Sequence, residues 1–150
     1  MKKIDLDTAP KGEGTRYPPP HNEPCKNRRW VRLGDAAGLT QFGANLVTLD
    51  PGVWSSQRHW HSHEDEFVYV TEGELVLVTD AGEEIMRPGD CAGFPAGEPN
   101  GHHLINRTDK PARLMEVGSR VEGDAVDYPD IDMISPADGS GYRHRDGRTY

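Results

Sequence analysis

Short apolar segments separated by turn residues recur through the middle of this 150-residue sequence and restrict its fold more than any other feature. Six of them are NLVTL (45–49), EFVYV (66–70), ELVLV (74–78), EEIMR (83–87), HHLIN (102–106) and RLMEV (113–117). Turns rich in glycine and proline, such as those at 50–52 and 88–90, lie between them. Short strands that recur about every ten residues between such turns are typical of antiparallel sandwiches and barrels. The sequence therefore predicts an all-β fold.

The composition changes along the sequence and divides the chain into three predicted parts. Residues 1–30 contain five prolines and little periodicity, which predicts an extended N-terminal arm. Residues 31–122 hold the apolar segments, with one helical turn expected at 35–39, and predict a single β-barrel. Residues 123–150 are polar and acidic but include YPDIDM (128–133), so we expect this C-terminal tail to pack on the barrel or on a partner subunit.

Charge and composition argue against several classes of function. A formal charge of −8 disfavours binding to nucleic acid or to anionic membranes, which need a basic surface. No stretch approaches the roughly 20 apolar residues of a membrane-spanning helix, and the start MKKIDLDTAP lacks the apolar run of a signal peptide. The two cysteines, Cys25 and Cys91, form no CxxC pair, and we expect Cys91 to be a small core residue. These features predict a cytoplasmic protein with neither nucleic acid nor a membrane as its partner.

The stretch RHWHSHEDEF (58–67) concentrates side chains that can bind metals. His59 and His61 alternate with a tryptophan, so in a strand both imidazoles project from one face. With 62–65 as a turn, Glu66 could return alongside them and add a carboxylate. Imidazole and carboxylate together are ligands for divalent transition metals, so this run predicts part of a metal site.

A further ligand is expected from HHLIN (102–106). In a strand His102 shares a face with the apolar Leu104, whereas His103 shares the opposite face with Ile105. The face that carries a core leucine points into the barrel, so His102 is the predicted ligand and His103 points away. The predicted metal ligands are therefore His59, His61, Glu66 and His102.

These residues fall into two motifs that resemble those of the cupin superfamily. The first motif is a glycine, HxH, a glutamate and a second glycine, here Gly52, His59, His61, Glu66 and Gly73. The second is a glycine, PxG, a histidine and an asparagine, here Gly89, Pro95, Gly97, His102 and Asn106. The motifs span 52–73 and 89–106, and the similarity covers roughly residues 40–118. Only the loops Gly52–His59 and Gly97–His102 are longer than the family pattern, which leaves the strand phases of the ligands unchanged.

The resemblance implies a double-stranded β-helix, a jelly-roll-like antiparallel barrel, with one divalent Zn, Ni, Fe, Mn or Co ion at its centre. It also bears on two alternative ligand sets. A frame of His61 and His63 with Glu66 leaves two residues before the carboxylate, too few for the family spacing. Asp65 in place of Glu66 would displace Gly73 from its expected offset. We therefore interpret His63, Glu64 and Asp65 as turn or rim residues.

RHWHSHEDEFVYVTEGE, FPAGEPNGHHLINR and the late YPDID with HRDG resemble a narrower group of small bacterial cupins, some of which carry a sugar phosphate isomerase label. This resemblance favours a metal-dependent isomerase that acts on a small hydroxylated carbonyl compound, a sugar or sugar phosphate. A metal-dependent dioxygenase and a non-catalytic binder of small ligands are the alternatives, because one fold hosts many chemistries.

An isomerase also needs a catalytic base and, for a phosphorylated substrate, a cationic group. Glu66 would be occupied as a ligand, so Glu116 on RLMEV is a candidate for the catalytic base, although the phase of its strand is open. Arg113, Arg107 or the arginines of the last eight residues could bind a phosphate group. The Pro-rich arm and the YPDID tail are suited to exchange between subunits, and the resemblance to cupins implies a homodimer.

Overall fold

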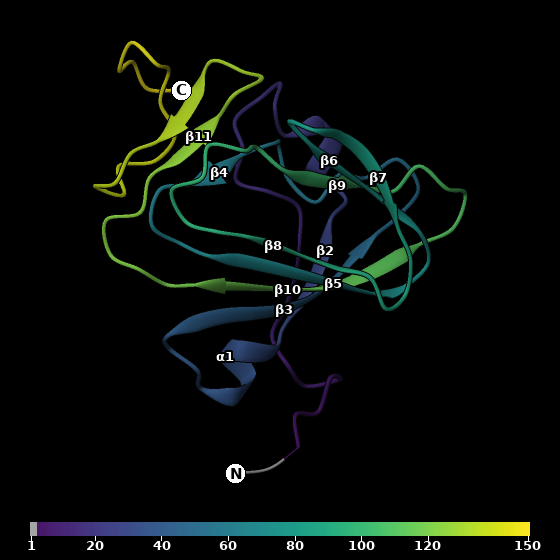
Figure 1. Cartoon of the computed structure of the whole chain (residues 1–150). Coiled ribbons are helices and arrows are strands. Elements are labelled where there is room, and N and C mark those ends of the chain that lie inside the picture. The colour runs from purple at the N-terminus through teal and green to yellow at the C-terminus, as the bar shows by residue number, and fades with distance from the viewer. Residues whose placement is uncertain (1–2) are drawn as a thin grey trace.

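All six apolar segments of the sequence overlap β-strands in the computed structural model, which describes residues 3–150 (Figure 1). The strands are β1 (Lys11–Glu13), β2 (Arg29–Arg32), β3 (Phe42–Leu49), β4 (Trp60–His61), β5 (Glu66–Glu72), β6 (Leu75–Thr79), β7 (Gly82–Met86), β8 (Cys91–Phe94), β9 (His103–Ile105), β10 (Ala112–Ser119), β11 (Val126–Tyr128) and β12 (Met133–Ser135). The helical elements are α1 (Leu33–Ala37), close to the predicted turn, and the 3-10 helix η1 (Glu23–Cys25). The predicted all-β fold is confirmed.

The strands form two walls of antiparallel sheet that enclose the barrel interior (Figure 1). One wall is a six-stranded sheet in the order β1-β2-β3-β10-β5-β8. The other wall contains the sheets β7-β6-β9 and β12-β11-β4. Two isolated bridges, Trp54 to Ile105 and His59 to His102, join the segment before β4 to the β9 segment. Both bridges are antiparallel, and they bring the two histidine-bearing segments to the same wall.

Alternation of apolar residues in the strands accounts for the core. Inward positions two residues apart are buried in β3, β5, β6 and β10, as the period of a strand requires. The main cluster consists of Val47, Leu49, Val53, Val68, Val70, Leu75, Leu77, Met86, Leu104, Ala112 and Leu114. Burial of one such aliphatic side chain is worth about 1.5–3 kcal/mol. Leu104 belongs to this cluster, as predicted. The face of β9 that carries Leu104 therefore points into the barrel.

Gly73 shows why the first motif ends on a glycine. Its φ of +76° lies in the left-handed region, which disfavours residues that carry a Cβ. A Cβ at this position would also lie 2.9 Å from both Cα and Cβ of Ala112. The β5–β6 turn thus passes directly against the start of β10, and only glycine fits there.

The terminal segments both add strands to the barrel. β1 pairs with β2 at the edge of the six-stranded sheet, and β11 pairs with both β4 and β12. The C-terminal segment, drawn yellow in Figure 1, therefore lies beside the strand that carries His61. Within residues 3–150 no helix has the length and apolar character needed to cross a membrane.

The structure corrects the prediction for one cysteine. Cys91 is exposed at the start of β8, an edge strand, and pairs in register with Tyr69 on the outer face of the sheet. The prediction was wrong because a strand start at a sheet edge has no second layer over its outer face. Cys25, in η1, is the buried cysteine.

Candidate metal centre

Three imidazole nitrogens surround one carboxylate oxygen inside the barrel. Oε2 of Glu66 lies 3.4 Å from Nε2 of His59, 3.6 Å from Nε2 of His61 and 2.9 Å from Nε2 of His102. Ligand atoms that share one ion at ~2.1 Å lie about 3–3.4 Å apart in tetrahedral or octahedral geometry. The structure thus brings all four predicted residues together around Oε2 of Glu66, and the ligand atoms of His59, His61 and Glu66 lie within 4.8 Å of one another, close enough to share one cation.

The backbone explains how residues distant in sequence meet at this point. His59 and His102 form a two-hydrogen-bond bridge, in which the amide of each donates to the carbonyl of the other at 3.2 and 2.9 Å. His61 follows two residues later and projects from the same face as His59. Glu66 begins β5 on the opposite wall and faces them across the interior.

Partners of the second ring nitrogens orient two of the imidazoles. Nδ1 of His59 lies 2.9 Å from the carbonyl oxygen of Gln57, and Nδ1 of His61 lies 2.6 Å from Oδ2 of Asp124. Because both partners are acceptors, each Nδ1 holds a proton, so each Nε2 could offer a lone pair to a bound metal after giving up any proton that it shares with Glu66. The His102 ring is instead stacked on Phe94, with centroids 3.6 Å apart, and its Nδ1 is buried without a hydrogen-bond partner in the described chain. This donor set fits a divalent transition metal.

Electrostatics keep the carboxylate of the cluster ionised. Burial acts to raise the pKa of Glu66, but hydrogen bonds from His102 and His59 outweigh it and hold that pKa well below its usual range. Burial also opposes protonation of His59, yet the Glu66 carboxylate raises the pKa of His59 above the ordinary value. Burial lowers the pKa of His102, which its hydrogen bond to Glu66 only partly offsets. A cation bound among these groups would replace protons that the imidazoles otherwise share with Glu66.

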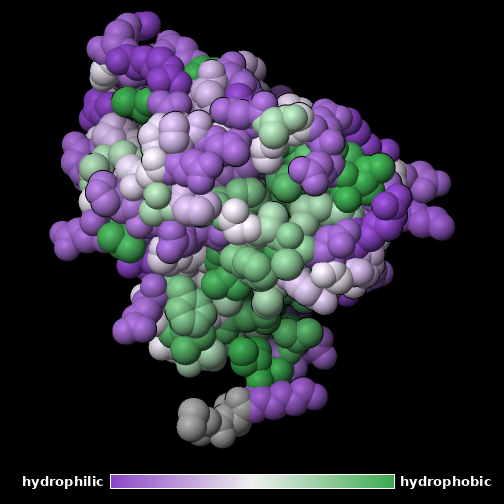
Figure 2. All heavy atoms as spheres, viewed as in Figure 1, coloured by the Kyte–Doolittle hydropathy of each residue, from purple (hydrophilic) through white to green (hydrophobic). Residues whose placement is uncertain are grey.

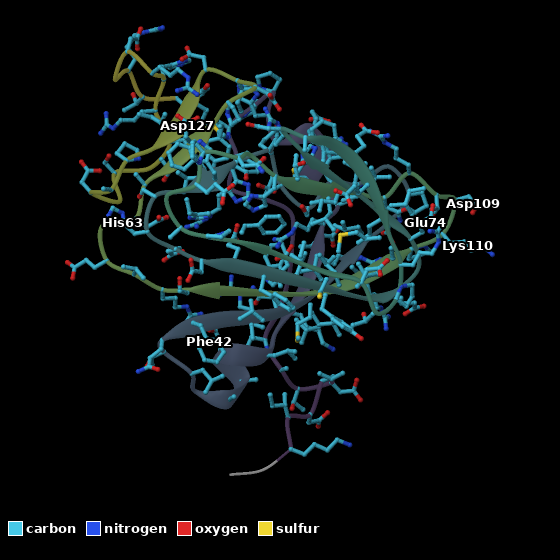
Figure 3. All side chains as sticks on the ribbon, viewed as in Figure 1. Phe42, His63, Glu74, Asp109, Lys110 and Asp127 are labelled. Carbon is cyan, nitrogen blue, oxygen red and sulfur yellow. The ribbon has the colours of Figure 1, made fainter. Side chains whose placement is uncertain are left out.

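The residues of the alternative ligand sets lie elsewhere. His63 is exposed, its Nδ1 bonds to Oγ of Ser62, and Figure 3 places it at the periphery of the molecule. Asp65 accepts a hydrogen bond from the amide of Ala96. His103 is buried on the opposite face of its strand, where its ring packs on Trp54.

Asp124 is the site residue that the sequence prediction missed. Besides His61, its carboxylate accepts hydrogen bonds from the amides of His63 and Glu64, at 2.9 and 3.2 Å, and so fixes the turn that follows the histidines. His61, Glu64 and Asp124 also form a second group of close metal-binding atoms, although Nδ1 of His61 is already directed at Asp124. No motif links Asp124 to HxH in the sequence, because the pairing of β11 with β4 brings it there.

A cavity of about 790 Å³ adjoins the histidine–glutamate cluster. Its lining includes His59, Glu66 and His102 and, farther along the same interior, the ion pair of Arg28 with Glu116. Glu116 faces inward because it is in register with the core residue Val68. The structure therefore settles the phase of the strand that the sequence left open.

None of the arginines proposed from the sequence for phosphate binding lines this cavity. Arg107 pairs with Glu83, and Arg113 lies 3.6 Å from Glu72, both on exposed surfaces. The arginines at 143, 145 and 148 bond within the C-terminal segment. Arg107 lies in the loop after β9, Arg113 faces outward on β10, and the other three lie on the C-terminal segment, so the structure places these arginines away from the cavity. The arginines that do line the cavity are Arg16, Arg28, Arg32 and Arg120.

Known proteins share this fold and site region. The family model described as the cupin domain matches residues 45–118. A crystal structure from Silicibacter pomeroyi, described as a sugar phosphate isomerase from a cupin superfamily, is 50% identical with a TM-score of 0.93 over 99% of this chain and 96% of that chain. One from Acidithiobacillus ferrooxidans, named provisionally as a sugar phosphate isomerase, is 31% identical with a TM-score of 0.73 over 78% and 74% of the two chains.

Among curated proteins, Protein SchB of Streptomyces halstedii is 28% identical over 123 residues, which are 79% of this chain and 87% of that protein. The match to the Silicibacter pomeroyi protein extends over nearly the whole of both chains, including both terminal segments. Together with the antiparallel barrel and the two motifs, these similarities show that the chain belongs to the cupin superfamily.

Proposed function

We propose that His59, His61, Glu66 and His102 bind one divalent transition metal and that the protein is a metal-dependent isomerase. Its substrate would be a small hydroxylated carbonyl compound, a sugar or sugar phosphate. The observation that carries this proposal is the convergence of three Nε2 atoms on one oxygen of Glu66. The 50% identity to a protein described as a sugar phosphate isomerase supports the choice of reaction.

The residues around the centre have the properties that such a reaction needs. A bound metal would polarise a substrate carbonyl and its adjacent hydroxyl. Glu66 is committed to the metal, so the proton transfer between neighbouring carbons falls to another group, and Glu116 is the proposed base. It faces the cavity from the strand next to that of Glu66. Burial raises the pKa of Glu116 and outweighs the opposing charge of Arg28, so its carboxylate is a stronger base than an exposed one.

Metal analysis of protein purified without a histidine tag or chelators tests the metal centre. We expect about one equivalent of a transition metal per chain, and we expect His59→Ala and His102→Ala to lose most of it. His63→Ala is the matched control, since it removes an exposed imidazole from the same run, and it should keep the metal. Wild-type protein without a stoichiometric transition metal would contradict the proposal.

Turnover assays test the reaction itself. Metal-loaded protein is incubated with a panel of aldoses, ketoses and their phosphates, and products are followed by nuclear magnetic resonance. Glu116→Gln should lower the rate by about 10²–10⁴-fold while metal content is unchanged. Oxygen uptake by protein loaded anaerobically with Fe(II) would instead favour the dioxygenase. Ligand-induced thermal stabilisation without product would favour a binding protein.

A further inference from the structure

Arg28 occupies a position in the cavity that its protein contacts do not explain. Its Nη2 donates to Oε2 of Glu116, and its guanidinium carbon lies 5.2 Å from the centre of the Trp30 ring. Its Nε is buried and has no hydrogen-bond partner among the described residues. A guanidinium carries five N–H donors, so the bond to Glu116 leaves most of them unused. The fold thus holds a cation inside the barrel that remains short of acceptors.

Arg28 differs from Arg32 and Arg120, two other arginines of the cavity. Its side chain is 21% exposed, compared with 52% for Arg32 and 47% for Arg120. Arg32 and Arg120 both contact Asp35 at the rim, at 3.6 and 2.8 Å. Arg28 alone among these three is mostly enclosed and directed at an acid of the interior wall. An anion entering the cavity would meet a guanidinium here with restricted access to water, where charge-assisted hydrogen bonds are strongest.

The spacing between Arg28 and the histidine–glutamate cluster suits the two ends of one small molecule. Glu66 is in register with Gly118 and therefore lies diagonally across from Glu116, at a Cα separation of about 7–8 Å for such neighbours. Arg28 contacts Glu116 and lines the same cavity as His59, Glu66 and His102. A compound of a few carbon atoms would reach from the cluster to the guanidinium.

We propose that Arg28 binds the anionic oxygens of the substrate, a carboxylate or phosphate group, and that this releases Glu116 from its ion pair. The planar fork of a guanidinium matches the two oxygens of either group, and the cation–π contact with Trp30 helps to orient it. This inference rests on the proposed function, because it assigns the substrate class and a role for Glu116 at the same site. It identifies the substrate as a small anionic hydroxycarbonyl compound.

The test measures anion binding in chelator-treated protein, so its outcome is independent of metal binding. Inorganic phosphate and acetate are titrated separately, and the thermal midpoint gives an apparent affinity. We expect saturable stabilisation of the wild type by at least one anion and at least about tenfold weaker binding by Arg28→Gln. The anion that binds more tightly identifies the group. Arg28→Lys keeps the charge but loses the fork, so we expect it to bind with intermediate affinity. This variant is a control for the possibility that Arg28→Gln binds weakly because it misfolds.

Two further variants make the test specific. Arg113→Gln removes an exposed arginine outside the cavity and should bind as the wild type does. Glu116→Gln removes the competitor for the guanidinium and should bind the anion more tightly, which a purely structural ion pair would not produce. Equal affinity in wild type and Arg28→Gln, no saturable effect of either anion, or no tightening in Glu116→Gln would overturn the inference. The proposed isomerase could still stand, since its metal and turnover assays are separate measurements.

Discussion

Oδ2 of Asp124 lies 2.6 Å from Nδ1 of His61, although 63 residues separate them in the sequence. The contact directs the Nε2 lone pair of His61 toward Glu66 and fixes the proton on Nδ1. The other carboxylate oxygen of Asp124, Oδ1, accepts hydrogen bonds from the amides of His63 and Glu64 and so stabilises the turn between the histidines and β5. Asp124 is thus a positioning residue for the candidate metal centre.

We expect Asp124→Asn to weaken metal binding by about 10–100-fold. The asparagine amide can point its NH₂ at Nδ1 of His61, which favours the tautomer with the proton on Nε2 and blocks the ligand atom. Metal affinity is measured by competition with a chromogenic chelator, and circular dichroism checks the fold. Asp138→Asn makes the same change on the exposed tail and should have wild-type affinity. Unchanged affinity in Asp124→Asn would show that the contact has no role in orienting His61.

His103 is expected to make stability depend on pH. Burial lowers its pKa to about 4, and in the unfolded chain its pKa is ~6.5. Between these values the unfolded state binds the proton more readily, so native stability falls as pH drops, by up to about 3 kcal/mol from this residue. His103→Asn keeps a donor for the Ser56 carbonyl and should flatten the dependence. Urea unfolding of chelator-treated protein between pH 4 and 7 measures it, and an identical slope in the variant would contradict the assignment.

The two cysteines should differ sharply in reactivity. Burial raises the pKa of the Cys25 thiol to about 12, and the side chain is inaccessible, whereas Cys91 is exposed. A chromogenic disulfide reagent should therefore label one thiol in the native protein and two in denaturant. Cys91→Ser should remove the fast reaction. Rapid labelling of native Cys91→Ser would show that η1 opens readily.

The outer face of the six-stranded sheet bears on the homodimer expected from the sequence. Phe67 and Tyr69 on β5 are 40% and 37% exposed, and in register beside them lie Val117 and Met115 of β10. Phe42 projects near α1, in the apolar lower part of the molecule (Figures 2 and 3). Contiguous apolar surface of this kind commonly marks an interface. We expect a dimer formed by two copies of this face.

Light scattering should therefore give twice the chain mass for the wild type and the single chain mass for the double variant Phe67→Glu, Tyr69→Glu. Ile85→Glu is the matched control, because Ile85 is 53% exposed on β7 of the opposite wall and should leave the dimer intact. A monomeric wild type at micromolar concentration would exclude this interface.

Several features followed from local sequence alone. The alternation of apolar residues located the main strands, and it separated His102, which faces the centre, from His103, which packs on Trp54. The same period placed His59 and His61 on one face. These predictions succeed because the side-chain direction in a strand is fixed by position along that strand and needs no knowledge of its neighbours.

Strands with weak local patterns were not foreseen. β2 has the sequence RWVR, and β12 contains only three residues, so neither shows a clear alternation of apolar and polar side chains. Their conformation comes from pairing with β3 and β11. For such segments, hydrogen bonds to a neighbouring strand decide the structure that intrinsic propensity leaves open.

The sequence by itself determined the all-β class, the turns and the set of side chains capable of metal binding. Only the tertiary structure decided that Asp124 supports His61, that Arg28 pairs with Glu116 inside the barrel, and that Cys91 is exposed. The reason is physical. Which face a residue takes depends on its own strand, but which residue lies opposite depends on the register between strands and on the closure of the barrel.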